Sequence, residues 1–292
     1  MTHAAAPNAA IAAEDPGHNW HLSSRERFEI LGAILLALFL FALDQTVVGV
    51  ALPKIVTDLN GNNLYTLAIT IYLLTSTITG PIYGKLSDLY GRRPIFLFAV
   101  GLFLVSSIVA GLSHEMWQFI LARGLQGLGG GAVFPVALAV IADLFPPEER
   151  AKYGALFGAV FGVSSVLGPL IGGGLTDTLG WPWIFFVNVP IGLVSFFVCW
   201  RLLPPVKNPE GGRNIDYVGA VLFAAAIGPA LVGLTNKQTA AWTDPWVIWP
   251  IVVGILILGL FLLWERRAAD PIVRLELFRN RYLSISVAAM FL

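Results

Sequence analysis

The chain has 292 residues, of which 57% are hydrophobic and 12% are charged, and its 18 basic and 18 acidic side chains leave no net charge. Soluble domains carry about 25% charged residues, so the composition excludes an ordinary soluble globule and indicates a membrane protein. The lack of a basic surplus argues against a nucleic-acid-binding protein, because neutralising phosphates requires one. The one cysteine, Cys199, excludes an internal disulfide and a multi-thiolate metal site, and four histidines leave little for a zinc enzyme.

The first segment is polar over residues 1–24 and contains Pro7, Pro16 and Gly17 but no apolar core. A secretory signal peptide would need a basic start and an apolar stretch before its cleavage site. We therefore predict a disordered cytoplasmic tail over 1–29, and we expect the first apolar run to act as its own insertion signal.

After this tail, the chain is divided by long runs that carry no charged side chain. Each run is about 20 residues long, which is the length of α-helix that crosses about 30 Å of hydrocarbon. The runs are apolar on every side rather than along one stripe, and this favours membrane spans over amphipathic surface helices. We predict eight spans: the first, 30–53, is interrupted only by Asp44, and the others cover 59–84, 94–114, 124–142, 153–176, 178–200, 217–236 and 245–264.

Basic residues are unevenly distributed between the two sides of these spans. Fifteen of the 18 fall in segments on the same side as the N-terminus, Lys54 and Lys237 fall on the other side, and Arg123 lies within a span. Because positively charged loops remain in the cytoplasm, we predict a multi-pass protein of the cytoplasmic membrane with its N-terminus inside.

The last segment, residues 265–292, contains a basic loop and then eleven uncharged residues after Arg281. Eleven helical residues reach about 16 Å, half of a bilayer, and would leave carbonyl groups and a carboxylate unsatisfied in hydrocarbon. We interpret them as the start of a truncated ninth span in a fragment of a longer chain. A short interfacial tail is the alternative.

Two ionisable side chains, Asp44 and Arg123, lie inside predicted spans. Placing a charge there costs about 2.5–3.5 kcal/mol on insertion scales, so an intramembrane ion is a candidate functional residue. Loss of water favours the neutral form of a carboxylate, and Asp44 is therefore a candidate for loading and releasing a proton; a static partner for a buried cation is the alternative. Arg123, with Gln126 and Gly127 on the same helix face, is a candidate for holding a carboxylate or lining a water cavity, unless its side chain extends to the headgroups.

The span over 153–176 has glycines at every fourth position from Gly154 to Gly162 and then a glycine-proline pair followed by three glycines. Small residues at this spacing allow another helix to approach closely, and proline removes a helical hydrogen bond. We interpret this span as a packing face or a hinge whose main residues are Gly168, Pro169, Gly172 and Gly173.

The segment between the second and third spans, Gly84–Pro94, is short and basic with one acidic residue. Its glycines permit a tight turn, and the acidic residue could bridge to the arginines or cap a neighbouring helix. We predict a loop with an ion-pair latch on the cytoplasmic side, formed by Gly84, Asp88, Gly91, Arg92 and Arg93.

Motifs of enzymatic chemistry do not stand out in the chain. It has no Gly-x4-Gly-Lys-Ser/Thr loop for ATP and no evident arrangement of Ser, His, Asp or Cys for nucleophilic catalysis. We therefore predict that the protein is not an enzyme, does not power itself with ATP and binds no metal or cofactor. The candidate proton site at Asp44 predicts a proton gradient as its energy source.

Five segments, taken in chain order, resemble the major facilitator superfamily. Gly84–Pro94 resembles the signature between the second and third spans of that family, Arg123 with Gln126 and Gly127 is similar to its span-4 motif, and Gly168–Gly173 resembles the antiporter motif of its exporters. Leu43–Pro53 and Trp183–Gly192 look like the corresponding segments of the fourteen-span drug:proton antiporters of the EmrB/QacA type. Single matches of this kind are weak, but five in order make the resemblance specific.

The resemblance implies an all-α polytopic membrane protein whose N-terminal six-span bundle, 30–203, consists of two inverted three-span repeats. It implies a cytoplasmic linker over 204–216 and two additional spans over 217–264. A second bundle would follow the truncated ninth span in the full-length chain.

For individual residues, the resemblance implies that Asp44 couples protons and that Arg123 is its electrostatic partner or relay. Gln126 and Asn188 are candidates for substrate binding. Leu89 stands where many family members have a basic residue, which weakens a detailed model of the latch.

The sequence and the resemblance together predict proton-coupled export, by alternating access, of lipophilic small molecules, cationic ones among them. The expected partners are such a substrate, protons and the lipid bilayer. Two alternatives are a facilitator-type porter of a metabolite or sugar without proton coupling, and a truncated membrane protein that does not transport.

Overall fold

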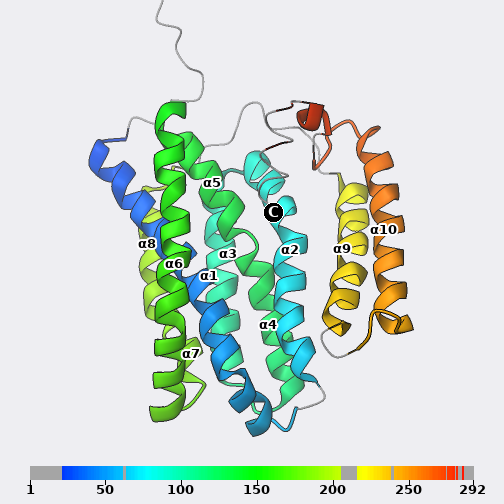
Figure 1. Ribbon diagram of the computed structural model, residues 1–292. Helices are drawn as coiled ribbons and strands as arrows, with labels where there is room; N and C mark the ends of the chain where they lie inside the picture. Colours follow the sequence, from blue (N-terminus) through cyan, green and yellow to red (C-terminus); the bar gives the residue numbers. More distant parts are fainter. Residues whose placement is uncertain are drawn as a thin grey trace, which may run out of the picture.

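The computed structural model describes residues 22–61, 64–204, 216–237, 240–273, 275–279, 281 and 285, and all regular structure within them is helical. The long helices stand side by side, and successive spans run in opposite directions (Figure 1). The fold is therefore all-α, as predicted. In chain order the helices are α1 Ser24–Asp58, α2 Tyr65–Tyr90, α3 Arg92–Gly111, α4 Met116–Gly130, α5 Val133–Leu144, α6 Pro147–Thr178, α7 Trp183–Phe186, α8 Asn188–Leu202, α9 Tyr217–Asn236, α10 Pro245–Glu265 and the short 3-10 helix η2 Leu275–Arg279.

Eight helical segments in the described part of the chain are long and apolar enough to cross a membrane, and they coincide with the eight predicted spans. The fourth span consists of α4 and α5, which are separated only by Gly131 and Ala132. The sixth consists of the short α7 and then α8. The helices thus have the number and length of a multi-pass membrane protein.

Helix α1 begins earlier than the sequence analysis predicted. The Ser23 hydroxyl accepts a hydrogen bond from the Glu26 N–H at 3.3 Å, and the Glu26 carboxylate accepts one from the Ser23 N–H at 2.9 Å. This capping box starts a helix ahead of the apolar run. Assigning residues 24–29 to a disordered tail is therefore wrong. Residues 1–21, residues 205–215 of the predicted linker, and residues 282–284 and 286–292 of the predicted truncated span lie outside the described residues.

The segment Gly84–Pro94 is not a loop, contrary to the prediction. Helix α2 continues to Tyr90 and α3 begins at Arg92, so a single residue, Gly91, separates them. Gly91 has a φ of 99°, which lies in the region that glycine adopts without the steric cost of a side chain. Charged side chains mark the end of a membrane-crossing run, but they do not end a helix. The charge pattern therefore predicted a loop over residues where α2 is still helical.

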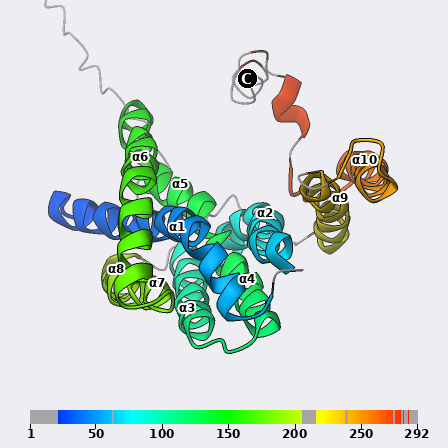
Figure 2. The same cartoon turned by 60° about the horizontal axis from the view of Figure 1, so that its bottom comes forward.

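Helices α1 to α8 form a six-span bundle in which α1 and α4 are central. Helix α1 packs against α6 and α8, whereas α4 packs against α2 and α3; the turned view shows α1 passing between these two groups (Figure 2). One apolar cluster, which includes Ile34, Phe96 and Val136, fills the upper end in the view of Figure 1. A second cluster, which includes Leu52 and Phe119, fills the lower end. The region between these clusters is the middle of the bundle.

Helices α9 and α10 form a pair beside α2 and contact the bundle mainly through that helix (Figure 2). The two helices are close because Gly254 has no side chain: a Cβ there would lie 2.7 Å from the carbonyl oxygen of Ala226. The hydroxyl of Thr70 on α2 lies 3.2 Å from the hydroxyl of Thr235 on α9. We refer to α9 and α10 as the outer pair.

Candidate functional site

Asp44 and Arg123 meet in the middle of the six-span bundle. Both residues are 2% exposed, and Arg123 Nη1 donates to Asp44 Oδ2 at 2.6 Å. Removing either charge from water costs several kcal/mol, and their mutual attraction offsets part of that cost. The two ionisable residues inside the predicted spans therefore form one buried ion pair. The alternative in which Arg123 extends to the headgroups is wrong.

Two amide side chains complete this arrangement. Gln126 Nε2 donates to Asp44 Oδ1 at 2.9 Å, and its Oε1 accepts from Arg123 Nη1 at 2.8 Å. Asn188 Nδ2 lies 3.4 Å from the same Asp44 oxygen and donates to Ser107 Oγ at 3.1 Å. The structure thus brings together four residues that were singled out in three separate motifs. We call Asp44, Arg123, Gln126 and Asn188 the Asp44 cluster.

Tyr72 of α2 covers the other side of the guanidinium. The Arg123 Cζ atom lies 4.1 Å from the centre of the Tyr72 ring, and Tyr72 is fully buried. A cation over an aromatic face is stabilised electrostatically, and more so away from water. The sequence analysis missed Tyr72 and Ser107, because an aromatic or a serine in an apolar span can equally face lipid or a neighbouring helix.

Some polar groups of this site still have capacity for a ligand. The Tyr72 hydroxyl and the Arg123 Nε have no hydrogen-bond partner among the described residues, although both are buried. Buried polar groups are normally satisfied, and water is the usual partner where protein atoms are absent. The Asp44 cluster can therefore accept a water molecule or a polar ligand group beside Arg123.

Glycines on α4 bring α2 close enough for this contact. A Cβ at Gly127 would lie 2.5 Å from the Tyr72 carbonyl oxygen, and a Cβ at Gly130 would lie 2.7 Å from the Tyr72 hydroxyl. Side chains at these positions would force α2 away from α4. Gly127 and Gly130 thus position Tyr72 over Arg123.

One face of α6 packs on α1 close to Asp44. A Cβ at Gly168 would lie 2.5 Å from the Thr46 Cβ, and a Cβ at Gly172 would lie 3.0 Å from a carbonyl oxygen of α1. Pro169 is exposed, and a Cβ at Gly173 would meet no atom of the described residues within 4 Å. Helix α6 is continuous through Pro169. Of the four residues predicted as a packing face or hinge, Gly168 and Gly172 form the contact with α1, whereas Pro169 and Gly173 face away from it.

A second polar cluster lies at the upper end of the bundle, where α2, α3 and α5 meet. Arg92 is 6% exposed and forms ion pairs with Asp88 and, at 3.0 Å, with Asp143. It also donates to Ser87 Oγ at 2.7 Å. The sequence analysis anticipated a bridge from Asp88 but missed Asp143, which is 51 positions from Arg92 in the chain. We call Ser87, Asp88, Arg92 and Asp143 the Arg92 cluster.

The other residues of the predicted latch have smaller roles. Gly91 provides the break between α2 and α3, and Gly84 lies inside α2 with its nearest neighbour, the Cβ of Pro135, 3.9 Å from a hypothetical Cβ. Arg93 is half-buried and makes no ion pair with a described residue. Within the same part of the chain, no group of three or more His, Cys, Asp or Glu side chains is placed to hold a metal ion.

The sequence matches known transporters over most of its length. Residues 34–262 match the family model described as Major Facilitator Superfamily. The chain is 39% identical over 262 residues to the multidrug transporter protein MdtP of Bacillus subtilis (strain 168), covering 88% of this chain and 47% of that protein. It is 38% identical over 267 residues to multidrug resistance protein 3 of the same organism, covering 91% and 52%. The chain therefore spans about half the length of these curated relatives.

Solved structures with the same fold are more distant in sequence. The human organic anion transporter MFSD10 superposes with a TM-score of 0.58 at 19% identity, over 73% of this chain and 56% of that one. A D-xylose-proton symporter superposes with a TM-score of 0.52 at 17% identity, over 81% and 67%. At this level of identity the likeness concerns the fold alone.

Proposed function

The chain belongs to the Major Facilitator Superfamily, and we propose on this premise that it is the N-terminal part of a proton-coupled exporter of lipophilic small molecules. It is a transporter of a multi-pass membrane type and not an enzyme. The names of its relatives favour drugs as the substrate class. The motifs around Asp44 and Asn188 favour the fourteen-span EmrB/QacA type, in which a second bundle completes the transporter.

The observation that carries the proposal is the Asp44 cluster. With Asp44 ionised, its charge and that of Arg123 balance. A proton on Asp44 leaves Arg123 with one uncompensated positive charge, which the Tyr72 ring and the Gln126 carbonyl oxygen still stabilise. A cationic substrate is repelled by this net positive charge, and the repulsion disappears when Asp44 is ionised. Proton and substrate therefore occupy the site alternately, which is the requirement for antiport.

Helix α1 links a change of charge on Asp44 to the packing of α1 against α6. Thr46, two residues from Asp44, contacts α6 at Gly168 and donates to the Ser164 carbonyl oxygen at 3.1 Å. Gly168 and Gly172 let α1 and α6 approach closely, and this contact forms a seam between the two helices. We propose that this seam shifts during alternating access, and that the Arg92 cluster acts as a latch at the upper end of the bundle.

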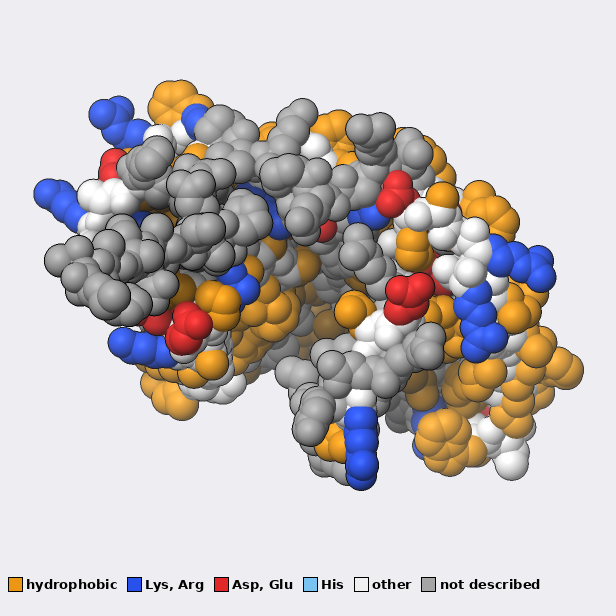
Figure 3. All heavy atoms as spheres, turned by 90° about the horizontal axis from the view of Figure 1, so that it is seen from above, with side chains coloured by type: hydrophobic (Ala, Val, Ile, Leu, Met, Phe, Trp, Pro, Cys, Tyr) orange, Lys and Arg blue, Asp and Glu red, His pale blue; other side chains and the backbone are white. Residues whose placement is uncertain are grey.

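We propose that the protein lies in the cytoplasmic membrane and that the upper end of the bundle faces the cytoplasm. Seen from that end, Lys and Arg side chains lie at several places around the face, and hydrophobic side chains cover its flanks (Figure 3). A surplus of basic residues on one side is typical of the cytoplasmic side.

The test is Asp44→Asn in the full-length protein, reconstituted in liposomes with an imposed pH gradient and ethidium as the probe. The amide keeps the size of the carboxyl group but cannot take up a proton, so we expect proton-driven efflux to be abolished. Asp58→Asn is the matched control, because Asp58 lies on the same helix but is exposed and pairs with Lys54. Near-normal efflux in Asp44→Asn would contradict the coupling role.

A second variant, Arg123→Lys, separates coupling from folding. Lysine keeps the charge but loses the planar group that bonds Asp44 and Gln126 together and lies over Tyr72. We expect proton-driven efflux to be strongly impaired, whereas the thermal unfolding midpoint should change little. Efflux that persists after the pH gradient is collapsed would instead favour a porter without proton coupling.

A further inference from the structure

Helix α1 exposes a stripe of small and apolar residues between α6 and α8. The stripe contains Gly32 and Leu36, which are one turn apart and therefore on the same helix face. No described atom lies within 4 Å of a hypothetical Cβ at Gly32. The missing side chain leaves an open space at this point of the surface.

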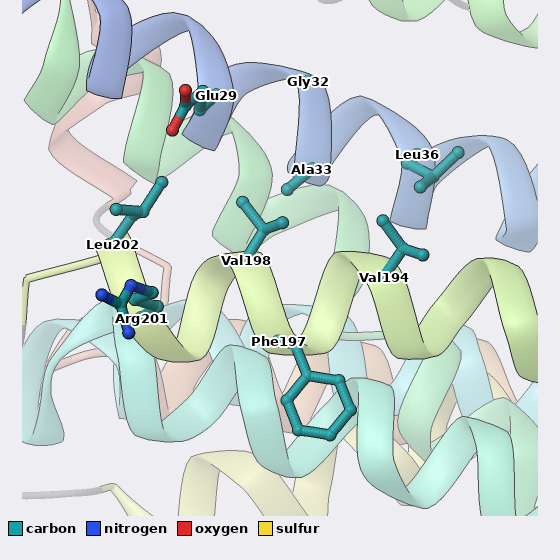
Figure 4. Close-up of a pocket in the computed structure, with 9 residues that line it drawn as sticks. All are labelled: Glu29, Gly32, Ala33, Leu36, Val194, Phe197, Val198, Arg201 and Leu202. Carbon is teal, nitrogen blue, oxygen red and sulfur yellow. The ribbon is translucent and has the colours of Figure 1, made fainter.

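Two hollows lie on either side of this stripe. One, of about 480 Å³, is formed with α8 and is lined by apolar side chains such as Val194 and Phe197 (Figure 4). The other, of about 370 Å³, is formed with α6 and is lined by Leu156 and Val163 among others. Gly32 and Leu36 line both hollows, so the two hollows are adjacent, with this part of α1 between them.

Charged residues occur at one end of the larger hollow only. Glu29 and Arg201 lie at the end near the upper face, and Leu36 and Val194 lie at the opposite end (Figure 4). Arg201 is in the last turn of α8, and Val194 is seven residues, about 10 Å, deeper along that helix. The hollow therefore runs from the level of the headgroups into the hydrocarbon.

The charge at this mouth is positive. Glu29 Oε1 accepts from Arg25 Nε at 2.7 Å, so those two charges neutralise each other. Arg201 is exposed and makes no ion pair with a described residue. Among the described residues that line this mouth, one positive charge remains, and it complements a ligand that carries a single negative charge at the membrane surface.

We propose that this surface binds one anionic diacyl phospholipid, with its phosphate on Arg201 and one acyl chain in each hollow on either side of Gly32 and Leu36. The two adjacent apolar hollows match the two acyl chains of such a lipid, and the one cation at the headgroup level matches its phosphodiester. A zwitterionic lipid would add a second positive charge beside Arg201 and fits less well. This site is separate from the Asp44 cluster and does not depend on the proposed transport activity.

The test is native mass spectrometry of the purified protein, delipidated and then titrated with phosphatidylglycerol or phosphatidylethanolamine of identical acyl chains. We expect tighter binding of phosphatidylglycerol. Arg201→Gln should weaken that binding about five-fold, the effect of one arginine at a membrane surface, and bring it to the level of phosphatidylethanolamine. Arg266→Gln is the matched control, since Arg266 is an exposed arginine at the same end of α10, and it should leave binding unchanged.

A second pair of variants tests the hollows. Gly32→Leu should fill the space between them and weaken binding of both lipids, whereas Gly259→Leu should not, although a Cβ at Gly259 also meets no described atom within 4 Å. Neither change introduces a clash, so both variants should fold. Equal binding of the two lipids, wild-type binding in Arg201→Gln or Gly32→Leu, or equal losses in the control variants would overturn the proposal.

Discussion

The middle of the six-span bundle and the interface of the outer pair show two different ways of holding helices together in a membrane. In the bundle, an ion pair and two amides join α1, α4 and α8 at the Asp44 cluster. In the outer pair, α9 and α10 meet through small residues, with Gly254 against the backbone of Ala226 and a Cβ at Gly254 only 2.9 Å from the Cβ of Ala230. In the most apolar 18-residue stretch of each span, 56% of the residues of α1 and 61% of those of the α4–α5 span are buried inside the protein. The corresponding share is 17% for both α9 and α10.

This difference follows from how many neighbours each helix has. A charged pair in hydrocarbon needs polar or aromatic groups on every side, and only central helices are surrounded well enough to provide them. Helices at the periphery face lipid over most of their surface, so they associate by close packing of small residues. The bundle should therefore be sensitive to changes of charge, and the outer pair to changes of volume.

The largest expected effect is that of Arg123→Leu. This change leaves the Asp44 carboxylate buried without its cation, and breaking one partner of a buried ion pair typically costs about 3–5 kcal/mol. We expect a strong decrease in the thermal unfolding midpoint of the purified protein in detergent.

The control adds Asp44→Asn to Arg123→Leu. No charge then remains in the middle of the bundle, and the new amide at position 44 could still accept a hydrogen bond from Gln126, so most of the lost stability should return. A double variant as unstable as Arg123→Leu alone would show that the packing of Arg123, and not its charge, supports the bundle.

The ion pair illustrates what the sequence makes visible. Asp44 and Arg123 could be singled out because charged residues are rare in apolar spans, and Asn188 could be singled out from its motif. Tyr72 and Asp143 could not, because nothing in their local sequence distinguishes a residue that faces a partner from one that faces lipid or water. Their contacts depend on the rotation and crossing of helices that are distant in the chain, and periodicity does not specify these.

Glycine patterns have the same limitation. The regular series Gly154, Gly158 and Gly162 looked like a packing face, yet no described atom lies within 4 Å of a Cβ at any of them. Gly168 and Gly172, only a few residues further along α6, do contact α1. The spacing thus predicts that small residues share a face, but it does not predict what that face meets.

A smaller effect is expected for Gly254→Leu in the outer pair. The new side chain would meet the backbone of Ala226 and Ala230 at 2.7–3.0 Å, so α9 and α10 must move apart. Overpacking of this kind typically costs about 1–3 kcal/mol. Limited proteolysis should show faster cleavage between α9 and α10, while the bundle keeps its unfolding midpoint.

Gly259→Leu on the same helix is the matched control, and it should behave as wild type because its position is open. Faster cleavage in both variants would mean that added bulk on α10, and not its packing on α9, exposes the connection.

The smallest effect is expected for Thr235→Val, which removes the hydroxyl that joins the outer pair to α2. Hydrogen bonds between membrane helices contribute on average about 0.6 kcal/mol. The Thr70 hydroxyl has one hydrogen, which it shares between the Thr66 carbonyl oxygen at 2.7 Å and Thr235 Oγ1 at 3.2 Å, so Thr70 keeps a partner when Thr235 is changed. We expect a double-mutant cycle of Thr70→Val and Thr235→Val to give a coupling energy no larger than that average. A coupling of several kcal/mol would show that the outer pair is attached by polar contacts, as the bundle is, and would remove the distinction between the two regions.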